Sequence, residues 1–310
     1  MSGAGLDGIG LDVGGTFLKA ARVEEGGRIA ERIHEPIAKD SAEGLLRQLA
    51  SAVNRLDPGN LIRTAGVGVP GIVERNTRVR ASPALRFLDG LAIGEQLAGR
   101  IGRRVFVEND ANAAALAEAW IGAGRGQDSL LLVTLGTGVG AGLVLRDRIW
   151  SGRSGYAGEL GHIRVDLNGV ACACGGTGCL ETVAGAPGWA RRAQEVLAAG
   201  QTSSLRLPAD QRAIVEAARA GDPGALEVVE GVARAVGMGI AGALQLLNIE
   251  CVVLGGGVSA AGSFLLDRIV EEVRPRTFAP IFADCTFCVA ALGNDAGVVG
   301  AARVGMLGLG

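Results

Sequence analysis

Two glycine-rich loops, each following an apolar run, constrain this chain more than any other feature. The first is Asp12-Val13-Gly14-Gly15-Thr16, and the second is Leu135-Gly136-Thr137-Gly138-Val139-Gly140. Glycine adopts positive φ and lets backbone N–H groups approach an anion closely, so a strand ending in such a loop is suited to bind a polyphosphate. A single loop is equally consistent with a hairpin turn, because glycine makes up 51 of the 310 residues. The pair predicts one phosphate loop in each of two domains.

A strand-to-helix junction between Val105 and Glu118 is the best place to look for a general base. The polar residues gathered at this junction are Glu108, Asn109, Asp110 and Asn112. One interpretation is a plain helix N-cap, which Asn and Asp favour. However, four polar groups are more than one cap uses, and α/β proteins bind ligands beyond the carboxyl ends of their strands. The junction is therefore a candidate catalytic segment.

Three cysteines and a histidine indicate a metal site. Cys172, Cys174 and Cys179 lie within eight residues, and His162 is just upstream. Three thiolates and one imidazole make a closed tetrahedral set for structural zinc. A disulfide plus a spare thiol is the alternative, but the chain shows no signal peptide and no apolar run long enough to span a bilayer, so we expect a reducing, cytoplasmic location. The other cysteines are expected in the core: Cys251, Cys285 and Cys288.

Length and composition fit a two-domain α/β protein. A chain of 310 residues is too long for one small core, and 48% hydrophobic with 4% aromatic residues suits sheets covered by helices. The net charge of −2 gives no reason to bind nucleic acid or an anionic membrane. The three arginines between Arg100 and Arg104 are expected at a solvated helix end.

The hydrophobic pattern predicts an N-terminal domain over 1–120, to which a final helix from about 295 to 310 returns, and a C-terminal domain over 121–294. Strands are predicted at 8–13, 17–23, 28–34, 62–69, 129–135, 140–145 and 251–254. Helices are predicted at 41–56, 187–198, 209–220 and 223–248.

The order of these motifs resembles that of ROK-family sugar kinases. The matching segments are Asp12 to Thr16, Gly68-Val69-Pro70-Gly71, Glu108-Asn109-Asp110, Gly136 to Gly140, Glu159-Leu160-Gly161-His162 and Cys172 to Glu181. The resemblance extends from Gly10 to Gly297. It implies the actin-like ATPase superfold, in which two ribonuclease H-like α/β domains close over a central cleft, here with a zinc-bound loop.

The resemblance also implies roles for individual residues. The residues that would bind the sugar are Gly71, Asn109, Asp110, Glu159, His162 and Glu181. The residues that would bind ATP and its phosphates are Asp12, Gly14, Gly15, Thr16, Gly136, Thr137, Gly138, Gly256 and Gly257. Val258 and Ser259, which follow Gly257, would lie at the adenosine of the nucleotide. The zinc ligands are His162, Cys172, Cys174 and Cys179. In this scheme Asp110 accepts the proton of the sugar hydroxyl, Asp12 orients water on Mg²⁺, and the protein forms a homodimer.

Two departures from the family bear on the substrate. Ala84 stands where many glucokinases of the family have an Asn that contacts the sugar, and Phe17 stands where Lys or Asn is frequent. Glucose is our first expectation, with N-acetylmannosamine, N-acetylglucosamine, allose or fructose as alternatives. A sugar-sensing repressor of the same family is the rival class; only about seven residues precede the first predicted strand, too few for a DNA-binding domain. A non-catalytic sugar-binding protein is a further alternative.

Overall fold

The structure is a computed structural model that describes residues 7–257 and 261–308. It divides into two compact units. The first contains the chain up to 128, the segment 142–158 and the C-terminal part from 294, and the second contains 129–141 and 159–293. The sequence placed all of 121–294 in one domain. The segment 142–158 groups with the first unit because Gly142 packs closely on Ala115, where a glycine Cβ would lie only 2.6 Å from the alanine Cβ.

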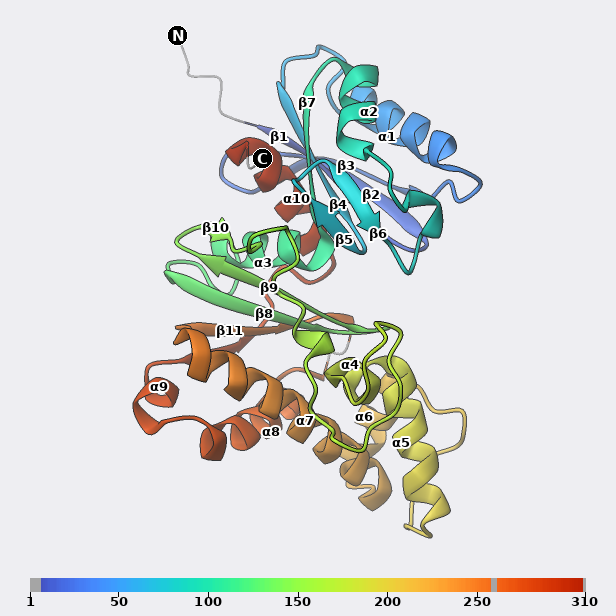
Figure 1. Ribbon diagram of the computed structural model, residues 1–310, viewed down its shortest axis with the longest axis vertical. Helices are drawn as coiled ribbons and strands as arrows, with labels where there is room; N and C mark the ends of the chain where they lie inside the picture. Colours follow the sequence, from blue (N-terminus) through green and yellow to red (C-terminus); the bar gives the residue numbers. More distant parts are fainter. Residues whose placement is uncertain (1–6, 258–260, 309–310) are drawn as a thin grey trace. The chain divides into compact units, whose positions relative to one another are not determined.

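A five-stranded mixed sheet forms the centre of the first unit, in the order β3-β2-β1-β4-β7 (Figure 1). Its strands are Gly8–Val13 (β1), Phe17–Val23 (β2), Ile29–Pro36 (β3), Thr64–Val69 (β4) and Arg104–Asn109 (β7). The pairs β1–β2 and β2–β3 are antiparallel, whereas β1, β4 and β7 run parallel. The parallel register aligns Asp12 with Gly68 and Gly68 with Glu108, so residues from three sequence motifs lie side by side at one end of the sheet.

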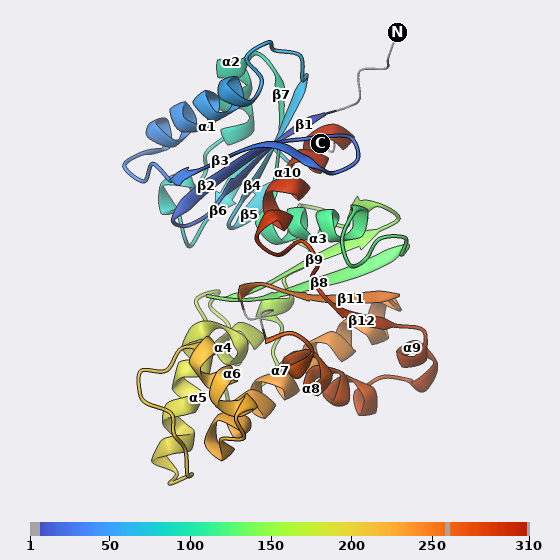
Figure 2. The ribbon, with the colours of Figure 1, turned by 180° about the vertical axis from the view of Figure 1, so that it is seen from behind.

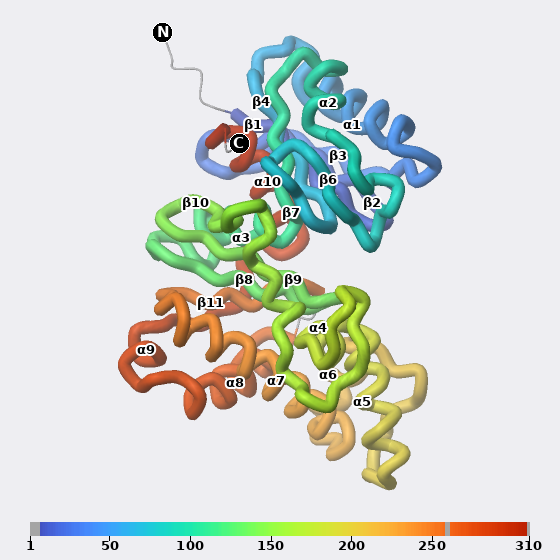
Figure 3. Tube along the Cα trace, viewed as in Figure 1, coloured from blue at the N-terminus to red at the C-terminus, as the bar shows by residue number. Residues whose placement is uncertain are grey.

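Helices cover both faces of this sheet. They are Ala42–Leu56 (α1), Ile93–Ile101 (α2), Asp110–Trp120 (α3) and Ala296–Leu307 (α10). Ile9 and Leu11 of β1 are fully buried in the core that includes α1 and α2. On the other face Gly10 lies against α10, where a Cβ would be 2.0 Å from the Val298 carbonyl oxygen. Figure 3 shows α10 in red beside the blue β1. Glycine in β1 therefore lets the C-terminal helix approach the sheet closely.

A short hairpin that the sequence did not predict follows β4. It consists of Ile72–Glu74 (β5) and Arg78–Ala81 (β6), and Arg86–Leu88 forms a 3-10 turn beyond it. Asn76 in its turn has a φ of 55°, and its carbonyl oxygen accepts a hydrogen bond of 2.7 Å from Val107 N in β7. The hairpin is thereby fixed to the main sheet.

The second sheet has the order β10-β9-β8-β11-β12, with the hairpins at one side and the parallel strands at the other, as in the first sheet (Figure 2). The strands are Ser129–Leu135 (β8), Val139–Leu145 (β9), Arg148–Ile149 (β10), Cys251–Gly255 (β11) and Thr286–Val289 (β12). β11 runs parallel to β8 and β12, whereas β9 and β10 are antiparallel. The same five-strand plan thus occurs twice, which agrees with the predicted two-domain α/β fold.

The helices of the second unit are Leu180–Ala184 (α4), Ala186–Ala198 (α5), Gln211–Arg219 (α6), Pro223–Leu247 (α7), Ser263–Val273 (α8) and Ala279–Ala283 (α9). The 3-10 turns are Leu160–His162, Arg274–Arg276 and Gly293–Asp295. α7 packs against α5, α6 and α8. Among the described residues no helix, including the 25-residue α7, is long and apolar enough to cross a membrane.

The predicted strands and helices are confirmed to within a few residues, but one local expectation was wrong. Arg103 is not part of a solvated helix end. α2 ends before Gly102, which adopts a φ of 66°, and the Arg103 side chain turns inward to a buried ion pair of 2.8 Å with Asp57.

The three cysteines outside the predicted metal site were expected in the core. Cys251 and Cys285 are buried as expected, whereas Cys288 is half-buried.

Candidate functional site

Both glycine loops are tight turns between neighbouring strands of a sheet. The first joins β1 to β2, and Gly14 N donates a 3.0 Å hydrogen bond to Phe17 O. The second joins β8 to β9, and Gly136 N donates a 3.0 Å bond to Gly138 O. None of Gly14, Gly15, Gly136 and Gly138 adopts positive φ. Both loops are therefore hairpin turns, and close approach of neighbouring atoms restricts the side chain at Gly14 and Gly138 but not at Gly15 or Gly136.

Glu181 provides the clearest example of such close approach. Its Oε2 accepts a 3.0 Å hydrogen bond from Val139 N, at the first residue of β9. A Cβ on Gly138 would lie 2.3 Å from the same oxygen. Ala186 N, at the start of α5, donates to the carbonyl oxygens of Gly136 and Thr137 at 3.1 Å each. A predicted sugar ligand and a predicted phosphate loop are thus brought together within the second unit.

Gly256 also packs against this loop region. It follows β11 with a φ of 86°, and a Cβ there would lie 2.3 Å from the Leu135 carbonyl oxygen. Both constraints require glycine. Gly257 is exposed, and the predicted adenosine contact at Val258-Ser259 lies outside the described residues.

Gln211 also contacts the second glycine loop, although the sequence gave no reason to select it. Its Nε2 donates a 3.1 Å hydrogen bond to Gly136 O.

In the first unit, Asn109 is both a helix cap and a tether. Its Oδ1 accepts hydrogen bonds from Ala111 N (2.9 Å) and Asn112 N (3.0 Å), and its Nδ2 donates to Gly71 O at 3.0 Å. The N-cap interpretation is correct for this residue. Gly71 has a φ of 124°, and a Cβ there would lie 2.2 Å from Ala81 O, so only glycine fits.

Asp110 begins α3 immediately after this cap. Its Oδ1 accepts a 2.9 Å hydrogen bond from Ala111 N. A Cβ on Gly68 would lie 3.8 Å from the Asp110 Cα, which places Asp110 beside the end of β4. The carboxylate at the N-terminus of a helix is favoured by the helix dipole.

Asp12 lies at the end of β1 with its side chain 15% exposed. The ammonium of Lys19 is 3.6 Å from its Oδ2 and donates to Asn294 O at 2.9 Å. A Cβ on Gly297, at the start of α10, would lie 2.7 Å from the carboxylate. Burial raises the pKa of Asp12, and the charge of Lys19 opposes that shift. The sequence did not identify Lys19, because its spacing from Asp12 becomes informative only once β1 pairs with β2.

The four predicted zinc ligands are brought together. One ligand atom from each of His162, Cys172, Cys174 and Cys179 lies within 4.8 Å of all the others. The Sγ atoms of Cys174 and Cys179 are 3.6 Å apart, and Cys172 Sγ is 3.6 Å from His162 Nδ1. Sulfur atoms bound to one tetrahedral zinc ion at about 2.3 Å lie about 3.8 Å apart, so the cluster fits that ion.

Binding of a metal at the cluster has to displace the proton of a weakly acidic thiol. Burial and the neighbouring thiols raise the pKa of Cys179 to about 12. Such a thiol ionises near neutral pH only if a cation compensates its charge, which a bound metal does.

Glu159 lies next to the metal cluster. Its Oε2 is 3.7 Å from His162 Nε2. Partial burial raises the pKa of Glu159, the charge of His162 lowers it, and the charge of Glu181 raises it again. Glu159 is therefore close enough to interact with both His162 and Glu181 in the second unit.

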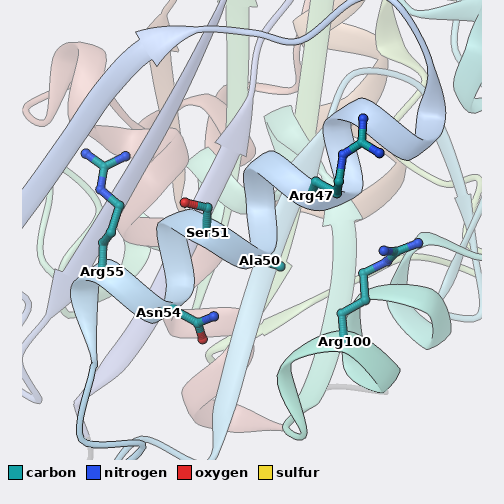
Figure 4. Close-up of a pocket in the computed structure, with 6 residues that line it drawn as sticks. All are labelled: Arg47, Ala50, Ser51, Asn54, Arg55 and Arg100. Carbon is teal, nitrogen blue, oxygen red and sulfur yellow. The ribbon is translucent and has the colours of Figure 1, made fainter.

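A surface hollow of about 460 Å³ lies elsewhere, on α1 and α2 (Figure 4). Its lining residues are Arg47, Ala50, Ser51, Asn54, Arg55 and Arg100. The arginines are paired with carboxylates, Arg100 with Glu43 at 2.7 Å and Arg55 with Glu35 at 2.9 Å. The hollow contains no predicted site residue, and we do not assign it to the reaction.

Comparison with known proteins agrees with the motif order. The ROK family model matches residues 8–305. The glucokinase of Thermotoga maritima is 36% identical over 304 residues, which cover 96% of each chain. A crystal structure of a ROK family glucokinase from Streptomyces griseus, in complex with glucose and AMPPNP, has a TM-score of 0.81 at 33% identity and covers 97% of this chain and 99% of that one.

A crystal structure of a ROK family transcriptional regulator, a homologue of the MLC protein of E. coli, is also similar. It has a TM-score of 0.87 at 29% identity, with 99% of this chain and 79% of that one covered. The shared fold therefore does not separate kinases from regulators. The family match over nearly the whole length, together with the two glycine loops and the Cys3His cluster, shows that this chain belongs to the ROK family, and its relatives of similar length include glucokinases.

Proposed function

We propose that this protein transfers the γ-phosphoryl group of ATP to a hexose, with glucose as the first candidate and glucose 6-phosphate as its product. The observation that carries the proposal is the turn from β7 to α3. There Asn109 uses its amide to cap the helix and to bind Gly71, which fixes Asp110 as the first residue of α3. The likeness to glucokinases, one of them bound to glucose and AMPPNP, supports the choice of substrates.

Asp110 is the proposed general base. Phosphoryl transfer has a loose transition state in which the protein mainly positions the two substrates. Asp110 would accept the proton of the sugar hydroxyl as the oxygen attacks phosphorus, a role worth a factor of about 10²–10⁴ in rate. Asn109, Glu159, His162 and Glu181 would bind the other sugar hydroxyls.

The two glycine loops would hold ATP through their backbone N–H groups. Asp12 would orient water on the magnesium ion that accompanies ATP, because its carboxylate oxygens can accept hydrogen bonds from water bound to the ion. That ion would neutralise charge on the transferring phosphoryl group.

The Cys3His cluster would hold structural zinc, because its interatomic distances fit a tetrahedral ion. A closed four-ligand site leaves no position for substrate, so the ion would act by holding the segment between Glu159 and Glu181 in place.

The test is an assay of ADP release with Mg-ATP across hexoses and N-acetylhexosamines, run on wild type and on Asp110→Asn. The exposed Asp267→Asn on α8 is the matched control. We expect turnover by wild type and control, and a loss of about 10²–10⁴ in kcat for Asp110→Asn with an unchanged circular dichroism spectrum. Nearly full activity of folded Asp110→Asn would exclude this base.

A non-catalytic sugar sensor is the second candidate, favoured by the structural likeness to a ROK family transcriptional regulator. Calorimetric glucose binding without ADP release from any sugar of the panel would support the sensor and overturn the kinase. Preference for another sugar would keep the kinase and change only its substrate.

A further inference from the structure

Glu108 is a buried carboxylate beside the proposed base that the reaction described above does not use. It is 4% exposed at the end of β7, and burial raises its pKa. Its Oε1 accepts hydrogen bonds from Asn109 N (2.9 Å) and Asn112 Nδ2 (3.0 Å), and its Oε2 accepts one from Asn76 Nδ2 (3.3 Å). A buried carboxyl group is costly unless such bonds satisfy it.

Asn112 is a second buried polar side chain at this turn, and it binds Glu108. It is 2% exposed and lies in the first turn of α3. Its Nδ2 bonds to Glu108, whereas its Oδ1 is buried with no hydrogen-bond partner among the described residues. An unsatisfied buried oxygen is unfavourable, so stability alone gives little reason for an amide at position 112.

The bonds of Glu108 connect the catalytic turn to the β5–β6 hairpin. At the tip of the hairpin, Asn76 binds β7 twice, through its carbonyl to Val107 N and through its side chain to Glu108. At the start of the hairpin, Gly71 O accepts from Asn109 Nδ2. The hairpin leads directly into the exposed Pro83-Ala84 segment, where Ala84 replaces the sugar-contacting Asn of many glucokinases of the family.

We propose that Glu108 is a positioning residue, which holds Asn109 and Asp110 at the orientation needed for the sugar and couples them to the β5–β6 hairpin. This inference rests on the proposed kinase function. Because Glu108 acts through its neighbours, its loss should affect the sugar more than ATP. A displacement of reacting groups by about 1 Å can lower a rate by roughly 100-fold.

The test compares Glu108→Ala, Glu108→Gln and Glu118→Ala. Glu118 is the matched control, because it is a fully buried carboxylate on α3 that binds Ala123 N at the other end of the helix. Both alanine variants should unfold at lower temperature than wild type. Only Glu108→Ala should lose about 100-fold in kcat/KM for the hexose, with the KM for ATP little changed.

Glu108→Gln should recover most of this activity. Its amide oxygen can accept from Asn109 N, and its NH2 group can donate to Asn76 once the Asn76 amide rotates to present its oxygen. Equal kinetics of Glu108→Ala and Glu118→Ala per folded molecule would overturn the inference. Activity of Glu108→Gln as low as that of Glu108→Ala would also overturn it. Inactive wild type would instead overturn the proposed function, and this inference with it.

Discussion

The Nε2 atom of His162 lies 3.7 Å from a carboxylate oxygen of Glu159, while Nδ1 of the same ring faces Cys172 Sγ at 3.6 Å. One imidazole thus connects the cysteine cluster to a proposed sugar ligand. A metal-bound histidine commonly donates its second N–H to a carboxylate, which fixes both the tautomer and the ring orientation. The position of Glu159 should therefore depend on the metal.

Removal of the metal should weaken sugar binding. We expect one zinc ion per chain by plasma emission analysis, and its removal by a strong chelator should raise the KM for the sugar and lower the unfolding temperature. Zinc should restore both properties and magnesium should not, because the ligand set is three sulfurs and one nitrogen. Full sugar affinity in zinc-free protein would contradict the coupling.

Substitution of Gly138 by Ala should destabilise the second unit. The added Cβ would lie 2.3 Å from Glu181 Oε2 and would displace the carboxylate from Val139 N. We expect a loss of about 1–3 kcal/mol in the free energy of unfolding. At Gly136 a Cβ meets no atom within 4 Å, so Gly136→Ala should leave the unfolding temperature nearly unchanged. Denaturant titration of the two variants checks the difference.

The buried pair of Arg103 and Asp57 should make stability depend on pH. Burial opposes ionisation of Asp57, but hydrogen bonds from Ile62 N and Leu61 N and the Arg103 charge together hold its pKa below the ordinary value. An acid with a lowered folded pKa stabilises the fold above its unfolded pKa of about 3.9 and loses that contribution as pH falls through the folded value.

Arg103→Met should therefore cost about 3–5 kcal/mol at neutral pH, because it leaves a buried carboxylate unpaired. The difference from wild type should shrink as pH falls below about 4, because the unfolded chain then binds a proton at Asp57 and the native ion pair contributes progressively less. Urea titrations across pH 3–7 measure it. A constant difference over this range would show that Arg103 acts by packing alone.

Restoring an amide at position 84 should improve the use of glucose. Ala84 is exposed, so an Asn side chain fits there without displacing the core. A hydrogen bond between the introduced amide and a sugar hydroxyl would contribute about 0.5–1.5 kcal/mol to binding. Ala84→Asn should therefore lower the KM for glucose by up to about tenfold. The measurement is kcat/KM for each sugar of the panel. An unchanged ranking of sugars would exclude this segment as a specificity determinant.

Much of the fold could be predicted because its signals are local. Apolar runs and caps identified β1, α1 and β8, and the motif order identified the family. The β5–β6 hairpin was missed because each strand is only three or four residues long and is stabilised by contacts such as Val107 N to Asn76 O. Arg103 was misplaced for a similar reason, since only its pairing with Asp57, 46 residues away, makes its burial favourable.

The sequence by itself determined which groups this protein has: two glycine turns, an Asn109-Asp110 junction at a helix start, and four soft metal ligands in a short segment. The tertiary structure alone decided what those groups contact. Glycine is needed at position 138 because Glu181, from a distant helix, lies beside it, and Glu108 is satisfied only where the hairpin meets β7. Periodicity and capping act over a few residues, whereas these contacts join segments that are remote in the chain and become neighbours only after the sheets form.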